Sequence, residues 1–152
     1  SGLRYHKICI LADADSDGAH IATLLCALFL KHYRPLVEAG HIYVAMPPLY
    51  RIDMGKDVYY AIDNQERDTM ITKLEAGSSK AKINVIRFKG LGEMNPPQLR
   101  ETTLDPATRR LMQLRIDETT TADENMDMMM AKKRAHDRRT WLEEKGDLAD
   151  CE

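Results

Sequence analysis

One stretch near the start of the chain constrains the fold more than any other. Residues 7–12, KICILA, form a short apolar run that predicts a buried strand. An acidic loop follows, in which Asp13, Asp15 and Asp17 alternate with small residues before Gly18. Residues 19–31 are apolar on nearly all sides and predict a buried helix. A buried strand that leads through a loop into a buried helix is typical of an α/β fold.

The three aspartates predict a site for a divalent cation. If residues 13–17 stay nearly extended, their two-residue period puts all three carboxylates on one side. Carboxylates that close repel one another, and a hard cation with oxygen ligands removes the repulsion. Ligands of open α/β sheets also gather at the carboxyl ends of strands. We therefore expect Asp13, Asp15 and Asp17 to form a Mg²⁺ site.

Four interpretations of the acidic loop compete. An EF-hand shares the opening D-x-D-x-D-G, but it needs a glutamate at loop position twelve, where this chain has Leu24, and a helix before the loop. A phosphatase of the haloacid-dehalogenase type would use Asp13 as the nucleophile and Asp15 as the acid and base, although that family usually has Thr or Val in place of Asp17. A metal-dependent nucleic-acid enzyme would hold Mg²⁺ against a phosphodiester. The simplest interpretation is a solvated turn capped by Asp17, and three acids beside a buried strand argue against it.

Composition limits the remaining possibilities. The chain has 152 residues, enough for one domain with a small addition, and a net charge of −2, so any sign of nucleic-acid binding must be local. The uneven placement of Cys9, Cys26 and Cys151 argues against a disulfide framework and suits a reducing cytoplasm. No signal peptide or membrane span is visible. Because a parallel sheet needs neighbours for a strand so close to Ser1, we expect a fragment, or further strands in a missing part.

The rest of the chain alternates strands and helices. Gly55 is expected in a hairpin turn, Asp63 and Asn95 as helix N-caps, Asp105 at the start of a further helix, and Gly146 at the end of the last one. The predicted strands are 7–12, 41–46, 49–53, 58–62, 83–88 and 113–117, and the predicted helices are 19–31, 63–75, a short one from 95, 105–111 and 124–145.

Three weaker features bear on nucleic-acid binding. Two glycines after Lys89, in KGLGE, let the backbone approach a ligand closely, although an ordinary turn with a solvated lysine fits equally well. His20, early in the first helix, is either a phosphate contact near the metal or a partly buried histidine. The basic run from 132 to 139 faces a DNA backbone or is a solvated helix face; it consists of Lys132, Lys133, Arg134, Arg138 and Arg139.

Four segments resemble the B subunits of bacterial type IIA DNA topoisomerases, a family that includes topoisomerase IV and DNA gyrase. They are ILADADSDGAHIATLL, MPPLYRI, RFKGLGEMNPPQLRETTLDPATRRL and AKKRAHDRRTWLEEKGD, which cover almost the whole chain in family order. The last is closer to topoisomerase IV. The resemblance implies a TOPRIM domain, a Rossmann-like parallel sheet with flanking helices, and a small C-terminal α/β tail that ends in a long helix. It implies three parts: the C-terminal part of TOPRIM at 1–53, a tail subdomain with the KGLGE loop at 54–117, and a linker and helix at 118–152.

The resemblance also implies a function, the ATP-dependent passage of one DNA duplex through a transient break in another. Family members bind Mg²⁺, with Mn²⁺ as a substitute, through the positions of Asp13 and Asp15, the expected catalytic residues, with Asp17 as a supporting third ligand. The family's remaining ligand is a glutamate in an upstream Glu-Gly-Asp-Ser motif, which this sequence does not contain. His20, Lys89 and Arg139 fall at positions expected to contact DNA.

The same resemblance implies partners. The attacking tyrosine belongs to the A subunit of the enzyme, which forms a heterotetramer of two A and two B subunits, and ATP binds to a domain that this sequence does not contain. Quinolone-type inhibitors act on the family at cleaved DNA. We expect a protein of the cytoplasm, associated with the nucleoid and not with a membrane, and a chain that in isolation is inactive or only a binding module for DNA and the A subunit.

Overall fold

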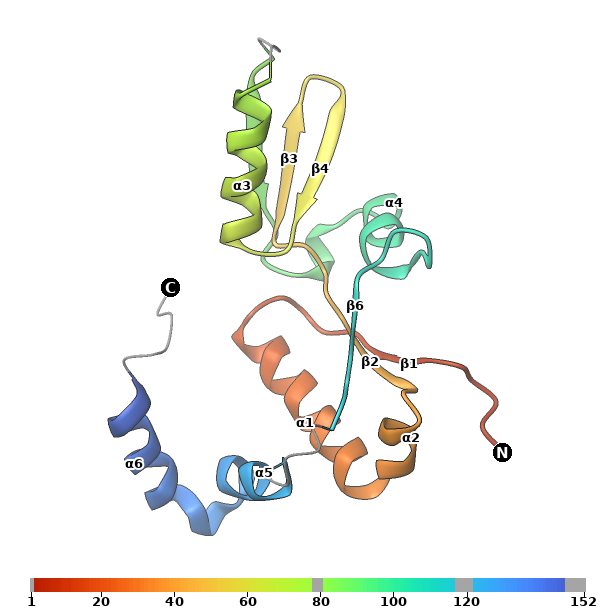
Figure 1. The fold of residues 1–152 in the computed structure, drawn as a ribbon. Helices are drawn as coiled ribbons and strands as arrows, with labels where there is room; N and C mark the ends of the chain where they lie inside the picture. The colour runs from red at the N-terminus through yellow and green to blue at the C-terminus, as the bar shows by residue number, and fades with distance from the viewer. Residues whose placement is uncertain (1, 78–80, 117–121, 147–152) are drawn as a thin grey trace. The chain divides into compact units, whose positions relative to one another are not determined.

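The computed structural model describes residues 2–77, 81–116 and 122–146 of the chain (Figure 1). The chain divides into two compact units, Ser1–Leu114 and Arg115–Glu152. The first unit contains two three-stranded sheets with helices, and the described part of the second is built from helices. The predicted mixed α/β class is confirmed. The division at 53 and 117 stays a prediction.

The first sheet contains the strand that precedes the acidic loop. Its order is β1 (Ile8–Ile10), β2 (Ile42–Ala45) and β6 (Leu111–Gln113). β1 and β2 are parallel, whereas β2 and β6 are antiparallel. Helices α1 (Ser16–His32) and α2 (Arg34–Glu38) connect the parallel pair. Among the described strands, the predicted parallel sheet is therefore one parallel pair with an antiparallel neighbour.

A glycine turns the chain from α2 back into the first sheet. Gly40 has a φ of +74°, a conformation that glycine adopts without strain. Its N–H donates to the carbonyl of Val37, and the N–H of His41 donates to the carbonyl of Leu36. This pair of hydrogen bonds is a Schellman motif, which satisfies carbonyls at the helix end and starts β2 in register with β1.

Helix α1 is less buried than its apolar sequence predicts. Four apolar residues at helical spacing lie 37–52% exposed, and these are Ile21, Leu24, Leu25 and Leu28. A helix that is apolar all round needs a packed layer on each side, and the described residues supply one. The strand before it is also only partly buried, because Ile10 is buried whereas Cys9 is exposed.

The second sheet leads into the KGLGE loop at residues 89–93. Its order is β4 (Asp57–Ala61), β3 (Tyr50–Met54) and β5 (Ile83–Arg87), all antiparallel, with α3 (Asn64–Glu75) alongside (Figure 1). The predicted hairpin is confirmed, since Gly55 with a φ of +65° forms the turn between β3 and β4.

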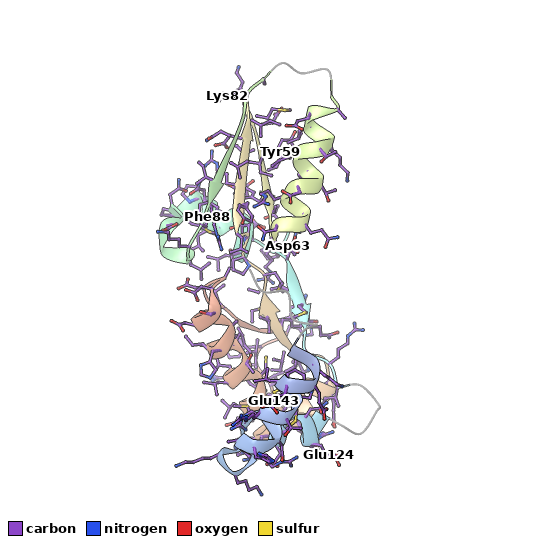
Figure 2. All side chains as sticks on the ribbon, turned by 90° about the vertical axis from the view of Figure 1, so that its left-hand side faces the viewer. Tyr59, Asp63, Lys82, Phe88, Glu124 and Glu143 are labelled. Atoms are coloured by element: carbon purple, nitrogen blue, oxygen red, sulfur yellow. The ribbon has the colours of Figure 1, made fainter. Side chains whose placement is uncertain are left out.

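Packing of α3 against this sheet forms its core. Tyr50, Ile52 and Ala61 are buried, and the helix contributes Met70, Ile71 and Leu74 to the same cluster. The predicted N-cap is confirmed, because the Asp63 side chain accepts the N–H of Glu66 at 2.7 Å. Figure 2 shows Asp63 at the same end of the sheet as Phe88, which directly follows β5, with Lys82 at the opposite end. The chain therefore leaves β5 at the end where α3 begins.

The segment from 95 to 113 departs partly from prediction. The short helix α4 (Pro96–Leu99) starts at Asn95 as predicted and leads into a π-helical turn, η2 (Arg100–Leu104). The predicted helix at 105–111 is wrong, because the chain makes a single turn after Asp105 and then enters β6. Strand pairing with β2 outweighs the local capping signal of Asp105. The strand predicted at 113–117 overlaps β6 at Gln113 alone, because the observed strand lies at 111–113 and residues 114–116 are not in a strand. Residue 117 lies outside the described residues.

The second unit contains two helices where the sequence predicts one. α5 (Ala122–Met130) is followed by a short turn, η3 (Lys132–Arg134), and by α6 (Ala135–Lys145). The predicted continuous helix at 124–145 is wrong, because Ala131 leaves the helical region with a ψ of 128°. The Arg138 guanidinium donates to the carbonyls of Met128 and Ala131, both at 2.8 Å. These bonds satisfy carbonyls at the end of α5 that a continuous helix would satisfy itself.

Within the described parts of the chain, no helix is long and apolar enough to cross a membrane.

Candidate metal and nucleic-acid site

The acidic loop is folded by its own hydrogen bonds. Asp15 has an extended backbone and is the N-cap of α1, because its Oδ1 accepts the N–H of Gly18 at 2.7 Å. Asp17 lies in the first turn of α1, where a negative charge is favoured by the helix dipole. The cap is therefore Asp15, whereas the turn interpretation placed it at Asp17. Asp13, Asp15 and Asp17 are all exposed.

Gly18 allows the start of α1 to lie against the backbone of Asp13. A Cβ atom at Gly18 would lie 2.0 Å from the carbonyl oxygen of Asp13 and 2.8 Å from its amide nitrogen. No side chain fits at that distance, so the contact requires a glycine. The consequence is a compact loop in which the backbone of Asp13 and the N-terminus of α1 are held together.

The structure brings the Asp13 carboxylate to the glycine-rich loop after β5. The Leu91 N–H donates to Asp13 Oδ1 at 2.8 Å, although the two residues lie 78 positions apart. Gly90 also lies against this carboxylate, because a Cβ atom there would lie 3.1 Å from Asp13 Oδ1. Sequence reasoning treated the acidic loop and KGLGE as separate motifs and missed the backbone donor at Leu91. A pair of glycines in one loop was the only signal of a close approach.

The donor chemistry of the loop fits Mg²⁺ bound together with a phosphate. The described hydrogen bonds use one carboxylate oxygen of Asp13 and one of Asp15. Within the described residues, no three His, Cys, Asp or Glu side chains are grouped closely enough to hold a metal ion. Mg²⁺ does not require such a cage, since it keeps several waters and binds one or two carboxylates plus substrate phosphates. Two exposed aspartates at one strand end match that kind of site.

The predicted DNA contacts belong to both units. His20 is exposed in the first turns of α1, which leaves its ring accessible to a phosphate. The Lys89 residue is exposed, and its backbone N–H donates to Glu93 Oε2 at 2.9 Å. Arg139 lies on α6 in the second unit, and its side chain is 78% exposed beside Glu143, with 2.8 Å between Nε and Oε1. An exposed pair of this kind contributes little stability, so the guanidinium can exchange Glu143 for a phosphate.

The basic run divides into structural and surface residues. Arg134 pairs with Asp137 and Asp127, and the hydrogen bond with Asp137 raises the pKa of the guanidinium. Arg138 holds the end of α5. Lys132 and Lys133 are exposed in η3. The run is therefore not one uniform cationic face.

A small cavity of about 210 Å³ lies between the second sheet and η2. Tyr60, Glu101 and Arg110 contribute polar groups to its lining. Burial, with a further contribution from the neighbouring Glu101 carboxylate, raises the pKa of Tyr60. Arg110 also donates to both carboxylate oxygens of Glu66, at 2.7 and 2.9 Å. The Arg110 guanidinium therefore joins the segment before β6 to α3.

Comparisons with known proteins identify the family. A family model described as the carboxyl terminus of the DNA gyrase B subunit matches residues 80–143. The B subunit of DNA topoisomerase 4 from Pseudomonas aeruginosa is 69% identical over 148 residues, 97% of this chain. Its counterpart from Escherichia coli is 66% identical over all of the chain. This chain belongs to the family of topoisomerase IV B subunits. The family resemblance predicted from the four segments is confirmed.

The topoisomerase IV relatives are much longer than this chain, which spans 24% of their length. The B subunit of DNA gyrase from Halalkalibacterium halodurans is 45% identical over 141 residues, which cover 93% of this chain and 22% of that protein. These relatives carry topoisomerase and gyrase names, so they lend no support to the phosphatase interpretation.

Proposed function

We propose that this chain is the part of a type II DNA topoisomerase B subunit that supplies Mg²⁺-binding carboxylates to DNA cleavage. The observation that supports this most is the exposed pair Asp13 and Asp15 at the carboxyl end of β1, in a chain of the topoisomerase IV family. The parallel pair β1 and β2, joined through α1 and α2, supports assignment of the first sheet to a TOPRIM-type domain.

The proposed enzyme passes one duplex through a break in another and uses ATP bound outside this chain. Its attacking tyrosine lies on the A subunit, so the tyrosines of this chain have no covalent role. The assembly contains two A and two B subunits, acts at the nucleoid in the cytoplasm, and is sensitive to quinolone-type inhibitors at the cleaved DNA. Decatenation and relaxation are the expected reactions, and the class is isomerase.

Each residue of the acidic loop has a role in this proposal. Asp13 and Asp15 provide the oxygen ligands, and Asp17 adds a third negative charge nearby. A bound Mg²⁺ supplies positive charge to the scissile phosphate and to the leaving 3′ oxygen. His20 and Lys89 donate to neighbouring phosphate oxygens and hold the strand against the loop. Arg139 adds a phosphate contact from α6.

Cleavage by a full-length B subunit together with its A subunit tests the metal role. Asp13→Asn and Asp15→Asn should each abolish Mg²⁺-dependent cleavage and leave DNA affinity largely intact, because the amide keeps the shape and loses the charge. Asp57→Asn, an exposed position at the start of β4, is the matched control and should cleave normally. Normal cleavage by Asp13→Asn would overturn the proposal. Trapping of an acyl phosphate on Asp13 would instead establish the phosphatase chemistry.

DNA binding tests the proposed cationic contacts. Lys89→Ala and Arg139→Ala should each weaken binding by about the same factor on all sequences and reduce the slope of log affinity against log salt by about one. Lys73→Ala, on the exposed side of α3, is the matched control. A slope that stays at the control value for Lys89→Ala would remove that residue from the interface.

A further inference from the structure

We propose that the Gly90–Leu91 peptide is a positioning element for Asp13, and that glycine at residue 90 lets the Asp13 carboxylate lie close against this peptide. This inference rests on the proposed role of Asp13 as a Mg²⁺ ligand and deepens it. The peptide belongs to the loop after β5, whereas Asp13 follows β1. The Asp13 carboxylate, which follows the first sheet, is therefore oriented by a backbone N–H in the loop that follows the second sheet.

The hydrogen bond from Leu91 limits what the Asp13 carboxylate can do. A carboxylate at the end of an exposed side chain rotates easily about its last torsion. The Leu91 N–H holds Oδ1 at 2.8 Å and so fixes the plane of the group. The second oxygen is left to a cation. Groups that orient metal ligands in this way typically change metal affinity by one to two orders of magnitude when they are lost.

The loop that carries this N–H is anchored at both ends. Phe88 is 5% exposed, and its N–H donates to the carbonyl of Leu49 at 2.8 Å. Met94, at the far end, is 8% exposed. Between them, the Glu93 carboxylate accepts the N–H of Lys89. Because both ends are buried, the loop presents the Leu91 N–H from a fixed position.

Space, and not backbone conformation, favours glycine at position 90. Its φ of −169° and ψ of 173° are extended values that any residue adopts. A Cβ atom there would lie 3.1 Å from Asp13 Cγ and Oδ1 and 3.2 Å from Oδ2. At Gly92 a Cβ atom would meet nothing within 4 Å. Gly90→Ala therefore requires the carboxylate to shift by a few tenths of an ångström, and Gly92→Ala is its matched control two residues away.

A second pair of variants isolates the N–H itself. Leu91 is the first residue of the short helical turn η1 (Leu91–Glu93), a position that tolerates proline. The extended ψ of Gly90 is also compatible with a proline after it. Leu91→Pro removes the donor, whereas Leu91→Ala keeps the donor and removes the same side chain. The difference between the two variants measures the hydrogen bond.

The experiment measures metal binding and cleavage in the full-length B subunit. Mn²⁺ titrations followed by electron paramagnetic resonance report binding without catalysis, and Mg²⁺ titrations of DNA cleavage with the A subunit present report function. Gly90→Ala and Leu91→Pro should raise the half-saturating concentration of both metals on the order of tenfold and regain cleavage at high Mg²⁺. Gly92→Ala and Leu91→Ala should titrate like the wild type. Gly90→Ala removes no group, so it carries the test if Leu91→Pro fails to fold.

Two other results separate this inference from the proposed function. Wild-type metal titrations for Gly90→Ala and Leu91→Pro, alongside loss of cleavage in Asp13→Asn, would overturn the positioning role and leave the function in place. Wild-type metal binding and cleavage in Asp13→Asn would overturn both.

Discussion

Asp15 has two roles that different substitutions can separate. Its side chain caps α1 through the 2.7 Å bond from the Gly18 N–H, and its charge is the proposed metal ligand. Asp15→Asn keeps an oxygen that accepts the cap bond and removes the charge. Asp15→Ala removes both. The free energy of unfolding should therefore fall mainly when the cap bond is lost, and DNA cleavage should be lost whenever the charge is removed.

The expected losses of stability follow from the cap bond and from the charge at the start of α1. Loss of an N-cap side chain costs about 1 kcal/mol, and loss of a negative charge at a helix N-terminus costs about 0.5 kcal/mol. Asp15→Ala should thus destabilise the chain by about 1.5 kcal/mol and Asp15→Asn by about 0.5 kcal/mol. At roughly 3 °C per kcal/mol for a chain of this size, the melting temperature should fall by about 4–5 °C for Ala and by about 1–2 °C for Asn.

Thermal melts of this chain check the cap, and cleavage assays of the full-length B subunit with its A subunit check the metal role. The matched control is Ser16→Ala, which removes the neighbouring hydroxyl and leaves the Asp15 carboxylate in place. It should match the wild type in both assays. Equal melting temperatures for Asp15→Asn and Asp15→Ala would refute the cap, since only the alanine removes the acceptor. Cleavage by Asp15→Asn at the wild-type rate would refute the metal role.

Three further perturbations probe the fold around the site. Gly18→Ala places a Cβ 2.0 Å from the Asp13 carbonyl oxygen and should cost about 3 kcal/mol in chemical denaturation; an unchanged midpoint would contradict the close contact. Arg138→Met should speed hydrogen exchange of the α5 amides by about tenfold, and unchanged exchange would mean that the guanidinium does not hold the helix end. Because burial and Glu101 raise the pKa of Tyr60, the stability that its neutral phenol contributes is present below about pH 10 and is lost at higher pH. Tyr60→Phe should therefore flatten the alkaline fall in melting temperature above about pH 10; parallel curves would contradict this.

Features set by neighbouring residues could be predicted from the sequence. The caps Asp63 and Asn95 act within three residues, so their residue types identify the helix starts. The hairpin turn at Gly55 depends on one glycine between two short strands. The strand, acidic loop and helix near the start are also local, although their burial is not. Apolar composition shows that α1 can be buried, and it does not show what covers it.

Features set by tertiary contacts could not be predicted. Nothing in the sequence near Ala131 stops a helix, and the break is held by Arg138 from the next helix. The helix signal at Asp105 is genuine but gives way to pairing with β2. The contact between Asp13 and Leu91 spans 78 residues and uses a backbone N–H, which carries no residue-type signature. A sequence motif does not identify a backbone donor, unless a glycine indicates that the backbone lies close to another group.

The long-range contact at Asp13 also changes how the acidic loop should be regarded. All three aspartates lie before residue 53, where the family resemblance predicts a boundary. The donor at Leu91 and the strand β6, which pairs with β2, both lie beyond that boundary. Residues 1–53 alone would keep every proposed ligand and the helix cap, and would lose the group that fixes the Asp13 carboxylate and one neighbour of β2. The acidic loop therefore supplies the ligands, and their orientation depends on the folding of the whole first unit, Ser1–Leu114.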